Sequence, residues 1–217
     1  MIPALTFPRD VPMFFRTQDG MRPAPLNFNP LNALVMPRPI AWISSLDANG
    51  VPNLAPYSYF NLVCADPPFV MFAPNAKAKD ELKDTWRNVN EVPEFVVNLV
   101  SEEDGPTMNR TSAPYPRAVN EFEVCGVRAL ASTLVRPMRV ASAKAALECR
   151  VFQKVALPVS KDGRENFVVI GEVLGVHIAD DVIANGRVDE RKLHPLTRLG
   201  YMNYGTLGEV FEMNRPD

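Results

Sequence analysis

Proline is the sequence feature that most restricts how this chain can fold. The chain holds 21 prolines among 217 residues, which is about twice the average share of roughly 5%. A proline inside a helix removes a hydrogen bond and clashes with the preceding turn, whereas sheet edges and turns accommodate proline readily. The composition therefore argues against a helical bundle and favours strands joined by loops.

Charge and hydropathy exclude several classes of protein. The formal net charge is −2, with 23 Lys and Arg against 25 Asp and Glu, so no basic surplus indicates a nucleic-acid partner. No apolar run approaches the roughly 20 residues that cross a bilayer, and the first residues carry no basic segment before an apolar stretch, as a secretory signal would. We therefore expect a cytoplasmic protein that binds neither nucleic acid nor membrane.

Cysteine and histidine usage predicts that the protein itself holds no metal. Cys64, Cys125 and Cys149 are widely spaced and form no CxxC motif, which is typical of free, mostly buried thiols in a reducing compartment. A structural zinc site needs about four clustered ligands. The only histidines, His177 and His194, lie far from any cysteine in the sequence.

The apolar pattern predicts mainly strands. Residues 41–46 form a short apolar run before the turn sequence Asp47–Gly50, so we expect a hairpin whose second strand covers 54–61. Alternation from Leu147 to Leu157 is typical of a half-buried strand, with Glu148 on the polar face. Further strands are expected at 69–73, 94–100 and 167–178, and the turn at 161–164 joins the two longest strands.

Helices are expected in only two places. Leu82, Trp86 and Val89 have helical spacing, which predicts a helix over 76–89, and a weaker helix is expected over 101–110. Strands thus outnumber helices, and short turns join them, so the sequence favours a closed antiparallel barrel with a few peripheral helices. We expect a single domain over 1–217, made of an extended N-terminal arm (1–35), a barrel body (36–205) and a C-terminal tail (206–217). Eight of the prolines lie within residues 1–39, and the arm is expected to pack on the body or on a second subunit.

Common catalytic motifs are missing from the sequence. It contains no GxxxxGK[ST], no GxGxxG and no GxSxG, so neither a P-loop, a Rossmann turn nor a hydrolase elbow is supported. A bound cofactor could still supply the chemistry. Three polar clusters suit a phosphorylated organic cofactor, and they are Tyr57–Asn61, Lys83–Asn88 and Arg198–Tyr201. In the second cluster, Lys83 could pair with a phosphate dianion.

The order of several motifs resembles the flavin reductase-like family with the FMN-binding split barrel. These motifs are PRPIAWISS (37–45), NLAPYSYFN (53–61), KDT (83–85) with Asn88, EFVVN (94–98), MNRTS (108–112), NEFE (120–123), GEV (171–173) with His177, and RLG (198–200). The resemblance covers roughly residues 35–205. One difference is that many relatives have a second glycine where this chain has Tyr201.

The resemblance implies a six-stranded antiparallel split barrel that forms a homodimer, with FMN at the dimer interface and NADH or NADPH as hydride donor. It places His177 near the nicotinamide as the candidate catalytic residue. It also implies an oxygenase or another electron-transfer protein as partner. The residues implied to bind the cofactor are Tyr57, Ser58, Tyr59, Asn61, Lys83, Asp84, Thr85, Asn88, Arg110, Thr111, Ser112 and Arg198.

Other interpretations of the same residues stay open. A histidine in an apolar strand can be buried and satisfied by the backbone, Tyr57 and Tyr59 can be core residues, and Arg198 can be part of a surface ion pair. For the whole protein, the alternatives are an FMN-retaining electron carrier similar to flavoredoxin, a flavoenzyme that acts on a small organic substrate, and a binding protein without redox activity, because one scaffold hosts many functions.

Overall fold

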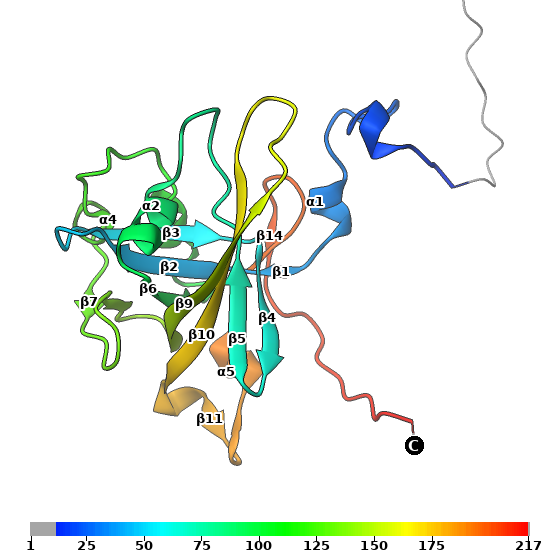
Figure 1. Cartoon of the computed structure of the whole chain (residues 1–217). Coiled ribbons are helices and arrows are strands. Elements are labelled where there is room, and N and C mark those ends of the chain that lie inside the picture. The colour runs from blue at the N-terminus through cyan, green and yellow to red at the C-terminus, as the bar shows by residue number, and fades with distance from the viewer. Residues whose placement is uncertain (1–11, 217) are drawn as a thin grey trace, which may run out of the picture.

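Seven antiparallel strands form the main sheet, in the order β3–β2–β6–β9–β10–β5–β4 (Figure 1). The computed structural model describes residues 12–216. The mainly β fold predicted from the sequence is confirmed, and the sheet has one strand more than the six that the resemblance implied. The strands of this sheet are β2 (Ala41–Leu46), β3 (Pro52–Tyr57), β4 (Phe60–Ala65), β5 (Pro68–Phe72), β6 (Glu94–Leu99), β9 (Ala145–Leu157) and β10 (Asn166–Ile178).

Shorter elements surround this sheet. In the described part of the chain, β1 (Arg38–Pro39), β13 (Thr197–Arg198) and β14 (Tyr204–Gly205) form a small sheet, while β7 (Ala129–Leu130) pairs with β8 (Arg139–Val140) and β11 (Ile183–Ala184) pairs with β12 (Arg187–Val188). The α-helices are α1 (Leu31–Leu34), α2 (Asp84–Glu91), α3 (Gly105–Arg110), α4 (Glu121–Val124) and α5 (Glu190–Leu193). Two 3₁₀ turns, η1 (Thr17–Asp19) and η2 (Asp180–Val182), complete the set. No helix within residues 12–216 has the length and apolar character needed to cross a membrane.

The sheet curves into a barrel because its two edge strands are neighbours in the sequence. Strands β3 and β4 lie at opposite edges of the sheet, yet only Ser58 and Tyr59 separate them. Such a short link cannot span a flat sheet of seven strands spaced about 4.8 Å apart. The Tyr59 carbonyl also accepts a hydrogen bond from the N–H of Ala73, just beyond β5, at 2.9 Å. The two edges therefore meet at the 58–59 corner.

The strand predictions agree closely with the structure, with two corrections. Strand β2 and the turn at Asp47–Gly50 lie where the sequence predicted them, but the expected strand over 54–61 is divided at the 58–59 corner into β3 and β4. Glu148, expected on a polar face, is fully buried, because three backbone N–H groups and His177 surround its carboxylate.

The predicted helix over 76–89 was wrong at its start, since α2 begins only at Asp84. The preceding chain turns back on itself: Ala78 pairs with Glu81, and Asp80 adopts a left-handed conformation with φ of 61°. Lys83 is still extended. The weaker helix predicted over 101–110 is likewise shorter, because α3 starts at Gly105.

The barrel core lies between the curved sheet and helix α2. Phe72 and Phe95 meet with ring centroids 5.2 Å apart, and both side chains are fully buried. Gly171 lies against Phe95, because a Cβ at this position would approach the ring to 2.4 Å. Trp86 of α2 stacks on Phe167 of β10 at 3.8 Å. Helix α2 thus packs on the barrel through Trp86 and Val89, two of the three residues whose spacing predicted it.

Proline is accommodated at the edge of the sheet, as the composition predicted. Pro52 and Pro56 both lie in edge strand β3. The N–H of Leu54, between them, points away from β2 and donates to Glu121. Because N–H groups alternate along a strand, the nitrogens of the two prolines face the same outer side, where no ladder hydrogen bond is needed.

The arm is not uniformly extended, because the residues described from 12 to 35 include η1 and α1. The expectation for residues 1–11 lies outside the described part of the chain. Arg38 joins α1 to the body: its guanidinium donates to the carbonyls of Asn32 (2.8 Å), Val35 and Leu199 (3.0 Å). The Tyr59 hydroxyl also donates to Asn32, at 2.7 Å.

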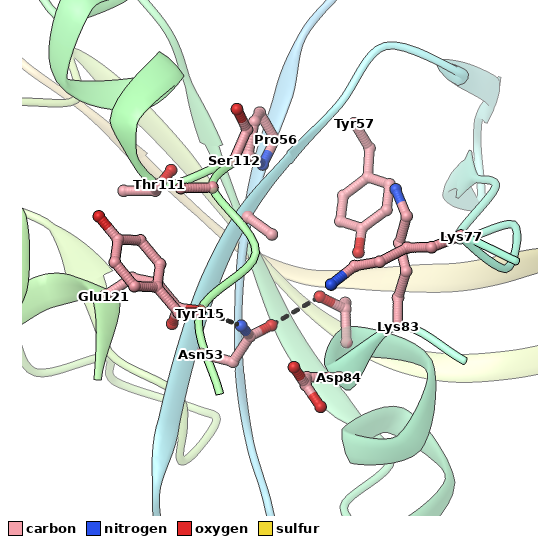
Figure 2. A pocket seen from close by; sticks show the side chains of 13 residues that line it. Asn53, Pro56, Tyr57, Lys77, Lys83, Asp84, Thr111, Ser112, Tyr115 and Glu121 are labelled. Atoms are coloured by element: carbon pink, nitrogen blue, oxygen red, sulfur yellow. Dashed lines mark hydrogen bonds between the residues drawn. The ribbon is translucent and has the colours of Figure 1, made fainter. Parts of the chain in front are cut away.

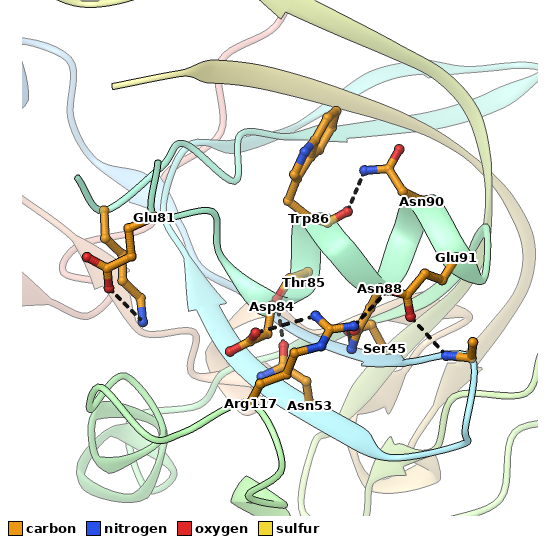
Figure 3. A network of polar contacts seen from close by, with 12 residues as sticks. Ser45, Asn53, Glu81, Asp84, Thr85, Trp86, Asn88, Asn90, Glu91 and Arg117 are labelled. Atoms are coloured by element: carbon orange, nitrogen blue, oxygen red, sulfur yellow. Dashed lines mark hydrogen bonds and ion pairs between the residues drawn. The ribbon is translucent and has the colours of Figure 1, made fainter. Parts of the chain in front are cut away.

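A buried polar network fixes α2 and α4 to strand β3, and Figure 3 shows its contacts with α2. Asn53 of β3 receives a hydrogen bond from the Thr85 hydroxyl at 2.7 Å and donates to Glu121 at 2.9 Å. A second carboxylate oxygen of Glu121 accepts from the N–H of Leu54 at 3.0 Å. The amide of Asn88 donates to Ser45 of β2 at 3.1 Å. These contacts fix where helix α2 begins relative to β3.

Replacing Thr85 with Val is expected to lower the free energy of unfolding by about 1–3 kcal/mol, because the buried Asn53 carbonyl oxygen would lose its donor. Chemical denaturation measures this difference. Thr206→Val is the matched control, since Thr206 is exposed and should change stability by about 0.5 kcal/mol or less. Equal stability of the two variants would contradict the importance assigned to the network.

Candidate functional site

Three adjoining hollows lie around residues 56–58, at the end of β3 and the barrel corner. The first, of about 440 Å³, lies between β3, the start of α2 and residues 111–115. The second, of about 590 Å³, lies between the same strand end, α3 and residues 198–204. The third, of about 420 Å³, lies between residues 56–59 and 73–75. Pro56 lines all three hollows, so they adjoin one another around the strand end.

The first hollow combines two lysines with a buried tyrosine hydroxyl (Figure 2). The Nζ atom of Lys83 lies 4.8 Å from the centroid of the Tyr57 ring. Burial, together with the positive charge of Lys77, lowers the pKa of Lys83. No carboxylate of residues 12–216 forms an ion pair with Lys83. The Tyr57 hydroxyl is buried without a hydrogen-bond partner, and burial strongly raises its pKa.

The carboxylates beside this hollow are occupied by other contacts. Asp84 pairs with Arg117 at 3.4 Å, and Arg117 also pairs with Glu91 at 2.9 Å (Figure 3). Burial raises the pKa of Glu121, although the hydrogen bonds from Leu54 and Asn53 oppose this effect. The hollow therefore offers cations and a hydroxyl to a ligand, which is the donor set that binds a phosphate or another anion.

The second hollow has one cation among apolar and uncharged polar side chains. Arg198 lies with its guanidinium 4.4 Å above the ring centroid of Tyr204, and the hydroxyl of Tyr204 donates to Asn109 at 3.5 Å. Ile40 and Met108 are almost fully buried behind the hollow. This arrangement suits a flat molecule with a negatively charged group.

Most of the predicted cofactor-binding residues line these hollows, although they come from separate parts of the sequence. They are Tyr57, Ser58, Tyr59, Lys83, Asp84, Thr85, Thr111, Ser112 and Arg198. The other three predicted residues line none of the three. Asn61 is exposed on β4 and bonds the next backbone N–H, Asn88 is buried against Ser45, and Arg110 donates to Thr107 and the Cys125 carbonyl.

His177, the predicted catalytic residue, lies on β10 and pairs with Ala146 of β9. It lines none of the three hollows. Its Nε2 atom is 2.5 Å from Oε1 of the buried Glu148. Burial alone would raise the pKa of Glu148, but the bonds to His177 and to the N–H groups of Thr133 and Leu134 lower it below its usual value. Within this chain, the histidine thus forms a contact that connects β10 to β9 and the 133–135 loop.

Four polar or charged residues that line the first hollow were not among the predicted site residues: Asn53, Lys77, Tyr115 and Glu121. Asn53 and Glu121 belong to motifs that carry the family resemblance, so the signal for them was present in the sequence. Lys77 and Tyr115 lie in loops without any pattern. Among the described residues, no group of three or more His, Cys, Asp or Glu side chains is arranged to hold a metal ion.

Comparison with known proteins agrees with the motif order. The flavin reductase like domain model matches residues 33–204. A protein of Halalkalibacterium halodurans is 35% identical over 192 residues, which cover 88% of this chain and 91% of that protein.

Two solved structures are also similar in sequence and in fold. Nitrilotriacetate monooxygenase component B from Bacillus cereus is 32% identical with a TM-score of 0.85, and the match covers 94% of this chain and 100% of that one. The 2-nitrobenzoate 2-nitroreductase of Pseudomonas fluorescens is 30% identical with a TM-score of 0.74, covering 86% of this chain and 88% of the other. With the family model matching most of its length, this chain belongs to the flavin reductase-like family.

Proposed function

We propose that this protein is an NAD(P)H-dependent flavin reductase that binds FMN in the first and third hollows and acts as a cytoplasmic homodimer. The observation that carries this proposal is the donor set at the start of α2. Lys83 has no carboxylate partner among the described residues, and the buried hydroxyl of Tyr57 has no hydrogen-bond partner. Both lack a partner that an anionic group such as the FMN phosphate would provide.

The residues around the hollows fit the other parts of FMN as well. Ser58 and Ser112 provide hydroxyls on either side of Pro56, which suits the polar ribityl chain and ring edge. Tyr57 and Tyr59 provide aromatic surface at the barrel corner. When bound, FMN would supply the hydride-accepting ring, since cofactors carry this kind of chemistry. The protein's own contribution is to hold the ring, neutralise the phosphate and limit access of water.

We further propose that the homodimer forms around the corner of the barrel. Tyr59 of the third hollow directly precedes β4, and β4 and α1 carry exposed apolar side chains, including Leu62, Val63 and Leu34. Tyr59 joins these elements through its bond to Asn32. A second subunit on this surface would cover these exposed apolar side chains, and exposed apolar surface is typical of interfaces. It would also close the open side of the proposed cofactor site.

Leu62→Glu is expected to convert the dimer to monomer and to weaken FMN binding at least tenfold, because a charge would be buried between subunits. Sedimentation velocity measures the mass, and fluorescence of free FMN measures the affinity. Val188→Glu, an exposed position on β12, serves as control and should leave both unchanged. A wild-type protein that sediments as a monomer with FMN bound would refute the dimer proposal.

Two relatives bear on the fate of the reduced flavin. The name of the Bacillus cereus protein identifies it as one component of a monooxygenase, which supports a role in supplying reduced flavin to a separate oxygenase. The name of the Pseudomonas fluorescens protein identifies it as a nitroreductase, which supports a second candidate function, the reduction of a small organic substrate by the bound flavin. The hollow around Arg198, next to the proposed flavin site, also favours this second candidate.

Anaerobic mixing with NADH, and separately with NADPH, tests the proposed function. The visible flavin band of the FMN-loaded protein should bleach much faster than that of free FMN under the same conditions. Bleaching no faster than free FMN with either nucleotide would refute the reductase proposal. A tightly held flavin that resists both nucleotides would instead favour the electron carrier or the organic-substrate reductase.

Lys83→Met should weaken FMN binding by about 10- to 100-fold, the effect of losing a charge-assisted hydrogen bond. Because burial already lowers the pKa of Lys83, wild-type affinity should also fall as the pH rises through that lowered pKa, where the ammonium loses its proton. The variant should lack this pH dependence. Lys79→Met, at an exposed position outside the hollows, is the control. Equal FMN affinity of the two variants would contradict the phosphate role of Lys83.

A further inference from the structure

We propose that the hollow around Arg198 is a separate subsite for a ring-bearing organic anion, the molecule that exchanges electrons with the flavin. This proposal rests on the proposed function, because it requires FMN in the adjoining hollows. Arg198 would bind the negative charge of the ligand, and the apolar residues behind the hollow would contact its ring.

The composition of the wall supports a ring-bearing ligand. Ile40 and Met108 form an apolar base, and Met202 lies at the exposed rim. Ligand sites generally combine such apolar surface with a few polar groups that fix orientation. Here Arg198, Tyr204 and Asn109 meet at one end, and the hydroxyls of Ser58 and Ser112 lie where this hollow adjoins the other two.

The charge of Arg198 is available to a ligand. Its Nη2 atom donates to the Tyr201 carbonyl at 2.5 Å, which fixes the guanidinium above the Tyr204 ring. In the described part of the chain, no carboxylate forms an ion pair with it. A planar guanidinium can bind a carboxylate or phosphate through two parallel hydrogen bonds. An anion would therefore find an oriented cation that is not neutralised by the protein.

The location of the hollow places such a ligand next to the flavin. Pro56 and Ser112 line both this hollow and the first one, while Ser58 lines both this hollow and the third. A ring bound between these residues would lie beside anything that occupies the barrel corner. Holding two reactants side by side is the main catalytic requirement of a direct hydride transfer.

The arm positions the wall that carries Arg198. The Arg38 guanidinium donates hydrogen bonds to the carbonyl of Asn32, which is in the arm, and to the carbonyl of Leu199, which is in the wall. At Gly200 the two segments touch so closely that a Cβ would lie 2.6 Å from the Cβ of Ala33. Tyr201 packs on Phe28 with ring centroids 5.5 Å apart. The arm thus fixes the 198–204 wall before a ligand binds, which reduces the entropic cost of binding.

Two sources of ligand share this chemistry: an aromatic carboxylate and a nicotinamide dinucleotide. The test titrates FMN-loaded protein with benzoate, with its neutral analogue benzamide, and with oxidised NAD⁺, and follows the flavin spectrum at equilibrium without turnover. Arg198→Gln, Arg198→Lys and the control Arg187→Gln are compared with wild type. Arg187 is exposed on the separate β11–β12 hairpin.

We expect benzoate or NAD⁺ to perturb the flavin spectrum of the wild type. Arg198→Gln should weaken binding of that ligand at least tenfold, while its affinity for FMN stays within twofold of wild type. Arg198→Lys should retain part of the binding, and Arg187→Gln all of it. A response to benzoate but little to benzamide identifies the carboxylate, and a response to NAD⁺ alone identifies the dinucleotide.

Normal FMN binding with no ligand response, or equal ligand affinity in Arg198→Gln and Arg187→Gln, would overturn this proposal alone. Failure of the wild type to bind FMN would refute the proposed function and this subsite together.

Discussion

The two-residue link between β3 and β4 is the constraint on which the rest of the structure depends. Because Ser58 and Tyr59 join the opposite edges of one sheet, the sheet has to curve until those edges meet. Curvature encloses the core around Phe72 and Phe95, and it brings the end of β3 beside residues 73–75. The corner that closes the barrel is thus also the corner around which the three hollows lie.

Position along β3 then decides which chemical groups face each hollow. Successive side chains of a strand point to opposite faces, so Asn53 and Tyr57 face helix α2 while Leu54 packs with Trp42 and Met108 on the other side. The Asn53–Thr85 bond fixes the start of α2 against this strand. Lys83, the residue before the helix, is consequently held over the Tyr57 ring. A buried polar network that stabilises the fold therefore also sets the position of the candidate phosphate-binding cation.

Local pattern predicted much of the fold but only part of the site. Alternation and turn sequences located β2, β9 and β10 because these signals act over a few residues. The start of α2 was mistaken because the left-handed turn at Asp80 depends on local backbone geometry that helical spacing does not reveal. Motif order selected Lys83 and Ser58, which line the hollows. It also selected Asn88, which does not line them because its side chain bonds Ser45 inside the fold. His177 shows the same limit, since alternation assigned its partner Glu148 to a solvent-facing row.

The distribution of charge suits the proposed chemistry, which needs few ionisable catalytic groups. Lys83 and Arg198 lie in different hollows on either side of the strand end, and neither pairs with a carboxylate of the described residues. Between them, Pro56 and Ser58 offer a small, uncharged surface. Two anionic molecules anchored at the two cations would bring their uncharged parts together at this surface. Hydride transfer between two rings requires contact and alignment of the rings more than it requires groups that transfer protons. Binding energy at the two ends would therefore be used to position the reacting parts in the middle.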